Sequence, residues 1–182
     1  MEFLMQLDGE VLLWIQQYLR RDFLNPVITF ITSLGNAGWF WILLSALMMF
    51  SKKYRKIGLT GLIALVIGFL ITNLWLKNMV MRIRPYEVVD GLTLIGRRAH
   101  DFSFPSGHST ASMAASSVFL ALMPRKYGIP AFLLGIFICF TRLYIGIHYP
   151  TDVLAGMLIG FAAAFAAIWI MRKYNRPCVE DS

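Results

Sequence analysis

A histidine and an aspartate late in the chain have the types and spacing for nucleophilic or proton-transfer chemistry. Asp152 follows His148 by four residues, and Pro150 between them favours the start of a helix. A carboxylate in that first turn can reach the imidazole, fix its tautomer and favour its cationic form. Helix starts favour acids in any case, so capping is the alternative role for Asp152. Arg142 is expected at the same level as this pair.

A second histidine lies one turn inside another predicted helix start. Residues 104–108 have the sequence Phe-Pro-Ser-Gly-His. Ser106 offers a hydroxyl, and Gly107 lets an anion approach the free backbone N–H groups of the first turn, which is how helix N-termini bind phosphate. His108 is then placed to give or take a proton. An interfacial histidine without a catalytic role is the alternative.

Two cations form a third cluster. Lys77 and Arg84 are seven residues apart, with no acid between them. Seven residues are about two helical turns, so both side chains project from one side at a separation of ~10 Å along the axis. Such a pair suggests a bound anion, and snorkelling to the lipid headgroups is the alternative. The three clusters together favour phosphoryl transfer through a covalent histidine intermediate.

The composition indicates that a membrane positions these clusters. The chain has 182 residues, of which 58% are hydrophobic and 15% charged, and its mean hydropathy is +0.63. A soluble domain has fewer apolar and more charged residues, and a disordered chain far fewer apolar ones. The net charge of +7 accompanies no basic amphipathic helix, so membrane topology and phosphate binding explain it better than nucleic acid. Cys139 and Cys178 are not expected to pair.

Apolar stretches predict an all-α, polytopic membrane helical bundle of about five transmembrane helices in one domain. The predicted spans are 25–50, 57–76, 105–123, 129–147 and 150–171, the first with a break at 35–38. The bundle is expected over residues 23–171 and includes an active-site loop at 77–104. Residues 172–182 are expected to form a tail after the bundle. Gly156 and Gly160 allow close helix packing, within one chain rather than between copies.

Residues 1–22 are predicted to form an amphipathic helix at the membrane interface. Leu7, Val11, Trp14 and Tyr18 recur at helical spacing, whereas acids such as Asp8 disfavour a membrane crossing. A helix packed on the bundle is the alternative. No cleavable signal peptide is evident, because no basic leading region precedes an apolar run.

The loops carry cations on both sides of the predicted bundle. Nine of them lie on the side that the positive-inside rule makes cytoplasmic, together with the C-terminus. These nine are Lys52, Lys53, Arg55, Lys56, Arg125, Lys126, Arg172, Lys173 and Arg176. The opposite side holds eight: Arg20, Arg21, Lys77, Arg82, Arg84, Arg97, Arg98 and Arg142. Because several of these eight belong to the clusters above, the active site is expected on the extracytoplasmic side.

In order and spacing, the clusters resemble the three-part signature of the type 2 phosphatidic acid phosphatase superfamily. The matching motifs are Lys77-(six residues)-Arg84-Pro85, Pro105-Ser106-Gly107-His108 and Thr141-Arg142-(five residues)-His148-(three residues)-Asp152. The resemblance covers 77–152 directly. One departure is Thr141, where the family usually has serine, although a hydroxyl is retained.

The resemblance implies a role for each matching position. His148 would be the nucleophile, Asp152 would orient it, and His108 would be the general acid. The phosphate oxygens would be held by Lys77, Arg84, Ser106, Gly107 and Arg142. The implied mechanism needs no metal or other cofactor, and the sequence has no cluster of carboxylates suited to magnesium.

In its small size, the chain resembles bacterial members of this superfamily that act on undecaprenyl pyrophosphate at the outer face of the cytoplasmic membrane. Phosphatidylglycerophosphate, phosphatidic acid and lipid A are alternative substrates. Arg97 and Arg98 are hypothesised to hold the second phosphate of a pyrophosphate, whereas His100 and Asp101 are interpreted as parts of a solvated loop. A lipid transporter or an inactive scaffold is the non-enzymatic alternative, although no inverted repeat supports transport.

Overall fold

The computed structural model describes residues 2–174, with side chains from residue 5 onward. Arg176 and Cys178, like the rest of 175–182, lie outside the described residues. The described part is helical and contains no strand, which confirms the all-α prediction. Its elements in order are α1 (Glu2–Trp14), η1 (Ile15–Leu19), η2 (Asp22–Leu24), α2 (Asn25–Ser33), η3 (Asn36–Gly38), α3 (Trp39–Met49), α4 (Arg55–Phe69), η4 (Leu70–Leu76), α5 (Lys77–Val80), α6 (Pro85–Val88), α7 (Gly107–Leu122), α8 (Arg125–Tyr144) and α9 (Pro150–Tyr174).

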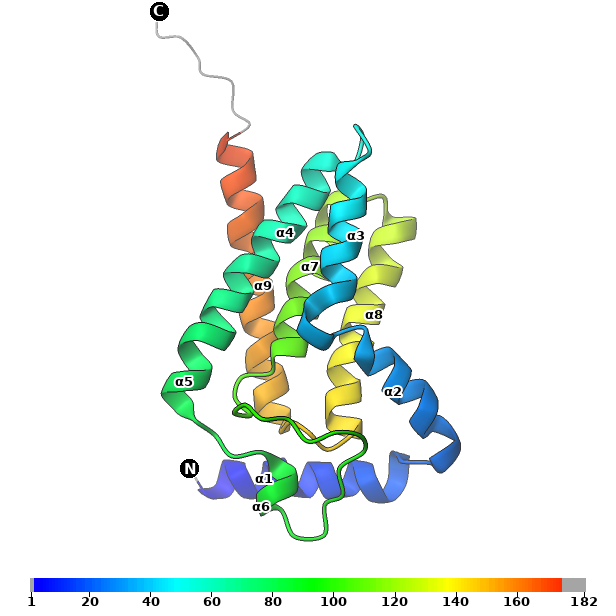
Figure 1. Ribbon diagram of the computed structural model, residues 1–182, viewed down its shortest axis with the longest axis vertical. Coiled ribbons are helices and arrows are strands. Elements are labelled where there is room, and N and C mark those ends of the chain that lie inside the picture. Colours follow the sequence, from blue (N-terminus) through cyan, green and yellow to red (C-terminus); the bar gives the residue numbers. More distant parts are fainter. Residues whose placement is uncertain (1, 175–182) are drawn as a thin grey trace, which may run out of the picture.

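The helices α3, α4, α7, α8 and α9 form an elongated bundle, and α1 lies across one end of it (Figure 1). The core combines large side chains such as Trp41 and Phe119 with alanines of α7 and α9, including Ala114 and Ala163. Small residues let helices approach closely where the hydrophobic effect gives no preference between lipid and protein contact. Because α7 is rich in small side chains, mostly alanine and serine, the other helices can pack closely around it.

Two glycines of α9 bring it against α7. A Cβ atom at Gly156 would lie 2.6 Å from the Ser106 carbonyl oxygen, and one at Gly160 would lie 2.7 Å from the Thr110 carbonyl oxygen. Both distances are too short for a methyl group, so only glycine permits this approach. The interpretation of Gly156 and Gly160 as a packing motif within the chain is confirmed.

The protein is a multi-pass membrane protein, but the predicted count of five spans is not confirmed. In the part of the chain that the structure describes, three helices are long and apolar enough to cross a membrane: Arg55–Val88, Arg125–Tyr144 and Pro150–Tyr174. A fourth span would be the pair Asp22–Ser33 and Asn36–Met49, which is bent by 44°. The remaining predicted span is α7, which has 16 residues and is shorter than the ~20 needed to cross a bilayer alone.

The predicted break in the first apolar stretch is confirmed. Ala37 has φ 48° and Gly38 has φ 68°, so the backbone leaves the right-handed helix between α2 and α3. Left-handed conformations cost little for glycine and more for alanine. The break turns α2 away from the bundle and leaves Asn36 at its inner end, near the site described below.

The N-terminal helix is present, but it also contacts the protein. Leu7, Trp14 and Tyr18 of the predicted apolar face are exposed, whereas Asp8 and Leu12 are buried. The helix therefore has an outward apolar face and a second face against the bundle, so the two alternatives for residues 1–22 are combined. Placement of the outward face at a membrane interface stays a prediction.

The loops sort to opposite ends of the bundle. The connections α3–α4 and α7–α8 and the end of α9 lie at one end, while α1, α6 and the loop before α7 lie at the other (Figure 1). The predicted grouping of the loop cations is thereby confirmed for the described residues.

The variant Gly160→Ala should destabilise the protein, because its Cβ meets backbone atoms of α7 that cannot move aside. Overpacking of this kind costs about 1–3 kcal/mol. Thermal unfolding in detergent should show a lower Tm. Gly9→Ala is the matched control, since its Cβ would lie 3.5 Å from a Val89 methyl group, an ordinary contact. Equal Tm values for the two variants would contradict the packing argument.

Candidate active site

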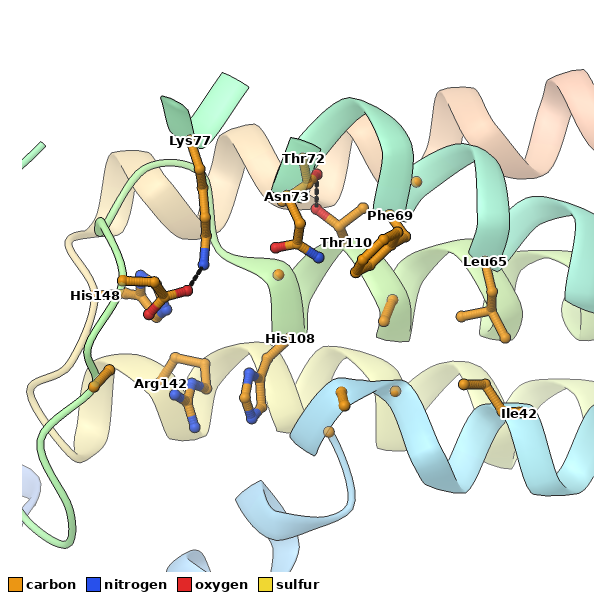
Figure 2. Close-up of a pocket in the computed structure, with 18 of the residues that line it drawn as sticks. Ile42, Leu65, Phe69, Thr72, Asn73, Lys77, His108, Thr110, Arg142 and His148 are labelled. Carbon is orange, nitrogen blue, oxygen red and sulfur yellow. Dashed lines mark hydrogen bonds and ion pairs between the residues drawn. The ribbon is translucent and has the colours of Figure 1, made fainter. Parts of the chain in front are cut away.

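A cavity of about 710 Å³ lies toward the end of the bundle where α1 lies, and residues of all three sequence clusters line it. Figure 2 shows Lys77, His108, Arg142 and His148 directed toward the same space. The charged and histidine side chains of the lining are Lys77, Arg84, Asp101, His108, Arg142 and His148. Toward the middle of the bundle the lining becomes apolar, with Ile42, Leu62, Leu65, Val66 and Phe69 of α3 and α4.

The predicted histidine–aspartate pair forms at the start of α9. His148 Nδ1 lies 3.5 Å from Asp152 Oδ2, and both side chains are buried. The same carboxylate oxygen accepts hydrogen bonds from the Ser103 hydroxyl at 2.5 Å and the Tyr149 backbone N–H at 3.0 Å. With Nδ1 directed at the carboxylate, Nε2 is the ring nitrogen on the cavity side, 3.4 Å from Arg84 Nη1.

The imidazole of His148 is held in its neutral form. Burial above all, together with the neighbouring Arg142 and Arg84, lowers the pKa of His148 to about 4, although Asp152 opposes them. Burial disfavours the charged form of a histidine, and nearby cations add to that effect. A neutral imidazole near pH 7 keeps its lone pair, which a nucleophile requires.

His108 occupies the first turn of α7 on the opposite side of the cavity. Its Nε2 lies 2.9 Å from Asn36 Oδ1, and with that oxygen as acceptor the ring nitrogen donates. Gly35 makes room for the ring, because a Cβ there would lie 2.6 Å from His108 Cδ2. The break between α2 and α3 thus orients the second histidine. The sequence predicts that break, but no local pattern assigns a role to Asn36.

Lys77 and Arg84, the two cations of the third cluster, share one carboxylate. Arg84 donates from Nη2 to Asp101 Oδ1 at 2.6 Å, and Lys77 forms an ion pair with Asp101 Oδ2. These contacts, led by the one with Lys77, hold the pKa of Asp101 down at about 2 although partial burial opposes them. The Asp101 side chain is 56% exposed, as expected for a solvated loop, but its contact with both cations was not predicted from the sequence.

Arg142 is buried, and no carboxylate among the described residues pairs with it. Its Nη1 donates to Thr32 Oγ1 at 2.7 Å, and its buried Nε has no hydrogen-bond partner among the described residues. A buried guanidinium normally pairs with an anion, because taking its charge out of water is costly. The wall of the cavity therefore holds an incompletely paired positive charge.

The remaining motif residues lie at or behind the cavity wall. Gly107 lines the cavity, whereas Ser106 is fully buried, and its hydroxyl accepts from the Ser109 N–H as the N-cap of α7. Thr141 is also fully buried, and its hydroxyl donates to the Ile138 carbonyl at 2.6 Å. Thr141, which stands where the family usually has serine, thus uses its hydroxyl for a hydrogen bond within its own helix. A phosphate contact by Ser106 stays a prediction.

Arg82 and Asp8 belong to the surroundings of the site and were given no role from the sequence. Arg82 donates to Asp152 Oδ1 and to Asp8 Oδ2, both at 2.7 Å. An acid at position 8 and an arginine at position 82 carry no local pattern that predicts their meeting. The sequence shows only that an acid interrupts the predicted amphipathic helix at position 8.

Three other loop residues remain outside the polar cluster. Arg97, Arg98 and His100 are exposed, and the Arg98 guanidinium lies 5.9 Å from the Tyr86 ring centre. The hypothesis of a second phosphate at Arg97 and Arg98 stays a prediction. Among the described residues, no group of three or more His, Cys, Asp and Glu side chains is arranged to hold a metal ion.

Because of the Asp101 ion pairs, part of the free energy of unfolding should depend on pH in the acid range. Since folding lowers the pKa of Asp101 from 3.8 to about 2, its contribution is present above about pH 4 and lost as the pH falls toward 2. Asp101→Asn should lower Tm near neutral pH, and its Tm gap to the wild type should narrow in acid. Asp90→Asn, at an exposed position of the same loop, is the control. A gap that does not change between about pH 7 and pH 3 would contradict this linkage.

Comparisons with known proteins agree with this geometry. The family model of the PAP2 superfamily matches residues 57–176. An undecaprenyl-diphosphatase of Sulfolobus acidocaldarius is 30% identical over 147 residues, which cover 81% of this chain and 70% of that protein. The undecaprenyl-diphosphatase BcrC of Bacillus subtilis is 34% identical over 146 residues, covering 78% and 72%.

A solved structure has the same fold. The transmembrane PAP2-type phosphatidylglycerolphosphate phosphatase of Bacillus subtilis superposes with a TM-score of 0.79 at 25% identity, covering 97% of this chain and 90% of that one. The motifs, the convergence of their residues on one cavity and the family match agree, and the chain belongs to the PAP2 superfamily of phosphatases.

Proposed function

We propose that the protein is a metal-independent membrane lipid phosphatase that works through a phosphohistidine on His148. Undecaprenyl pyrophosphate, cleaved to undecaprenyl phosphate, is the proposed substrate. The observation that carries the proposal is the charge of the cavity wall. Among the described residues that line the cavity, three carry a positive charge, namely Lys77, Arg84 and Arg142, and one, Asp101, carries a negative charge. The lining therefore has a formal net charge of +2, which a phosphate group can neutralise.

In the first step, the lone pair of His148 Nε2 attacks phosphorus and forms an N–P bond. The P–O bond to the leaving group breaks, and His108, which enters this step as the imidazolium, donates a proton to the departing oxygen and becomes neutral. Lys77, Arg84 and Arg142 stabilise the negative charge on the remaining phosphoryl oxygens. Asp152 stabilises the positive charge that develops on the imidazole.

In the second step, water attacks the phosphohistidine. His108, now neutral, accepts a proton from that water, the N–P bond breaks, and inorganic phosphate leaves. The neutral imidazole of His148 is regenerated, so the cycle balances without a metal ion or cofactor. His108 is the general acid in the first step and the general base in the second.

The shape of the cavity supports a lipid as the substrate. Its polar end holds the proposed catalytic groups, and Ile42, Leu65 and Phe69 continue the wall toward the middle of the bundle (Figure 2). A headgroup phosphate can bind at the polar end while the apolar chain follows the apolar wall. The two relatives named undecaprenyl-diphosphatase favour a pyrophosphate, and the related phosphatidylglycerolphosphate phosphatase supports that lipid as the alternative.

We place the site on the extracytoplasmic side of a bacterial cytoplasmic membrane, with the C-terminus in the cytoplasm. Support comes from the cation-rich loops at the end of the bundle opposite the cavity, which the positive-inside rule assigns to the cytoplasm. A transporter would place its charges near the middle of the membrane, whereas these lie at one end of the bundle.

The substitution His148→Ala should lower phosphate release by about 100-fold or more, because it removes the nucleophile. His108→Ala should have an effect of similar size through loss of the proton donor. Both are measured as phosphate release by purified protein in EDTA with undecaprenyl pyrophosphate, phosphatidylglycerophosphate, phosphatidic acid and lipid A. His100→Ala is the matched control, because this exposed histidine lies outside the cavity lining. Full turnover by His148→Ala would overturn the mechanism, and complete inactivation by EDTA would overturn metal independence.

The double substitution of Arg97 and Arg98 by glutamine tests the pyrophosphate hypothesis. If these cations contact a second phosphate, the loss in kcat/KM should be larger for undecaprenyl pyrophosphate than for phosphatidic acid, by about 10-fold. The same substitution at Lys52 and Lys53, at the opposite end of the bundle, is the control for net charge. Equal losses on both lipids would count against a second phosphate site.

A further inference from the structure

The N-terminal helix contributes a buried carboxylate to the surroundings of the site. Asp8 is 4% exposed although it belongs to a helix that lies across the end of the bundle. Its Oδ1 accepts from the Thr151 backbone N–H at 3.1 Å, and its Oδ2 accepts from the Thr151 hydroxyl. Thr151 stands in the first turn of α9, where backbone N–H groups have no partner within the helix. Asp8 therefore caps the helix that carries Asp152.

Arg82 connects Asp8 to Asp152. Its guanidinium donates from Nη2 to Asp8 Oδ2 and from Nη1 to Asp152 Oδ1, each at 2.7 Å, and its side chain is 15% exposed. The guanidinium also lies over the Tyr149 ring, 3.8 Å from the ring centre. This planar group is fixed on two edges and one face, so little freedom remains in its position.

The two oxygens of Asp152 have separate tasks. Oδ1 binds Arg82, whereas Oδ2 faces Ser103, the Tyr149 N–H and His148 Nδ1. Removal of Arg82 would leave Asp8 and Asp152 as two buried carboxylates without their shared cation. Removal of the Asp8 charge would leave Arg82 and Asp152 as a neutral pair behind the histidine.

We propose that Arg82 and Asp8 are positioning residues that fix the orientation of Asp152 and tune the charge it presents to His148, so that the N-terminal helix is part of the catalytic unit. The proposal rests on the proposed role of His148. Neither residue is among those that line the cavity. Both therefore act through Asp152 and not on the substrate.

Six charged or titratable groups among the described residues surround the His148 imidazole. The charged and titratable groups that face His148 are Asp152 of α9, Arg142 of α8, His108 of α7, Lys77 of α5, and Arg84 and Asp101 from the two ends of the intervening loop. None of these six residues is itself replaced when Asp8 or Arg82 is substituted. A shift in the titration of His148 then reports the altered charge behind Asp152.

The test compares Asp8→Asn, Arg82→Gln and their combination. Loss of the Asp8 carboxylate should lower the pKa of His148, and loss of the Arg82 cation should raise it, by about half to one pH unit. The combination removes one charge of each sign, so its pKa should return toward the wild-type value. A purely structural role would not give shifts of opposite sign that cancel.

Two measurements read these shifts. The His148 imidazole is titrated by NMR in folded, substrate-free protein, with His148→Asn identifying its resonance, and the acid limb of kcat/KM is followed on one lipid. In both single variants, kcat should fall by about 10-fold or more while KM stays unchanged, because neither residue contacts substrate. Glu10→Gln is the matched control, since Glu10 is an exposed acid of the same helix.

The outcomes separate this proposal from the proposed function. Opposite pKa shifts that cancel in the combination support it, and shifts of the same sign or no shift overturn it. Full turnover by His148→Ala would overturn the proposed function, whereas the NMR titration does not depend on turnover. Should Arg82→Gln fail to fold, Arg82→Lys replaces it: retained charge should keep the acid limb in place while kcat falls, and a displaced limb would overturn the proposal.

Discussion

The uncompensated positive charge at one end of the bundle is the constraint on which the site depends. Guanidinium groups withdrawn from water are costly unless an anion faces them. Arg84 meets this cost through Asp101 and three backbone carbonyls, whereas Arg142 has Thr32 as its protein partner and keeps Nε unpaired. The protein thus holds in place a positive charge that an anionic group can neutralise, and this charge adds to the effect of burial in lowering the pKa of His148.

Irregular backbone allows the charged residues to meet. The break at Gly35–Gly38 brings Asn36 to His108, and the close approach of Gly156 to Ser106 holds the starts of α7 and α9 together. In both places a glycine without a side chain permits the contact. The same small residues that pack the membrane helices therefore also set the geometry of the two histidines.

The site is assembled from both ends of the chain. Asp8 of α1, Arg82 after α5 and Asp152 of α9 form one continuous ion-pair network. The chain crosses the bundle several times between these residues, so their contact fixes the N-terminal helix against the start of the last one. A helix with an outward apolar face is in this way coupled to the groups proposed to carry the chemistry.

The sequence by itself determined the membrane-helical class, the family motifs, the break in the first span and the sorting of the loop cations, because hydropathy, glycine and proline placement and motif spacing act locally. The count of five spans is not confirmed, because α7 has 16 residues, fewer than the ~20 that cross a bilayer alone. Tertiary structure alone decided that Asp101 neutralises Lys77, that Asp8 reaches Arg82 and that Arg142 lacks a carboxylate. Such pairings join residues far apart in the chain, and their energy depends on burial, which no local pattern encodes.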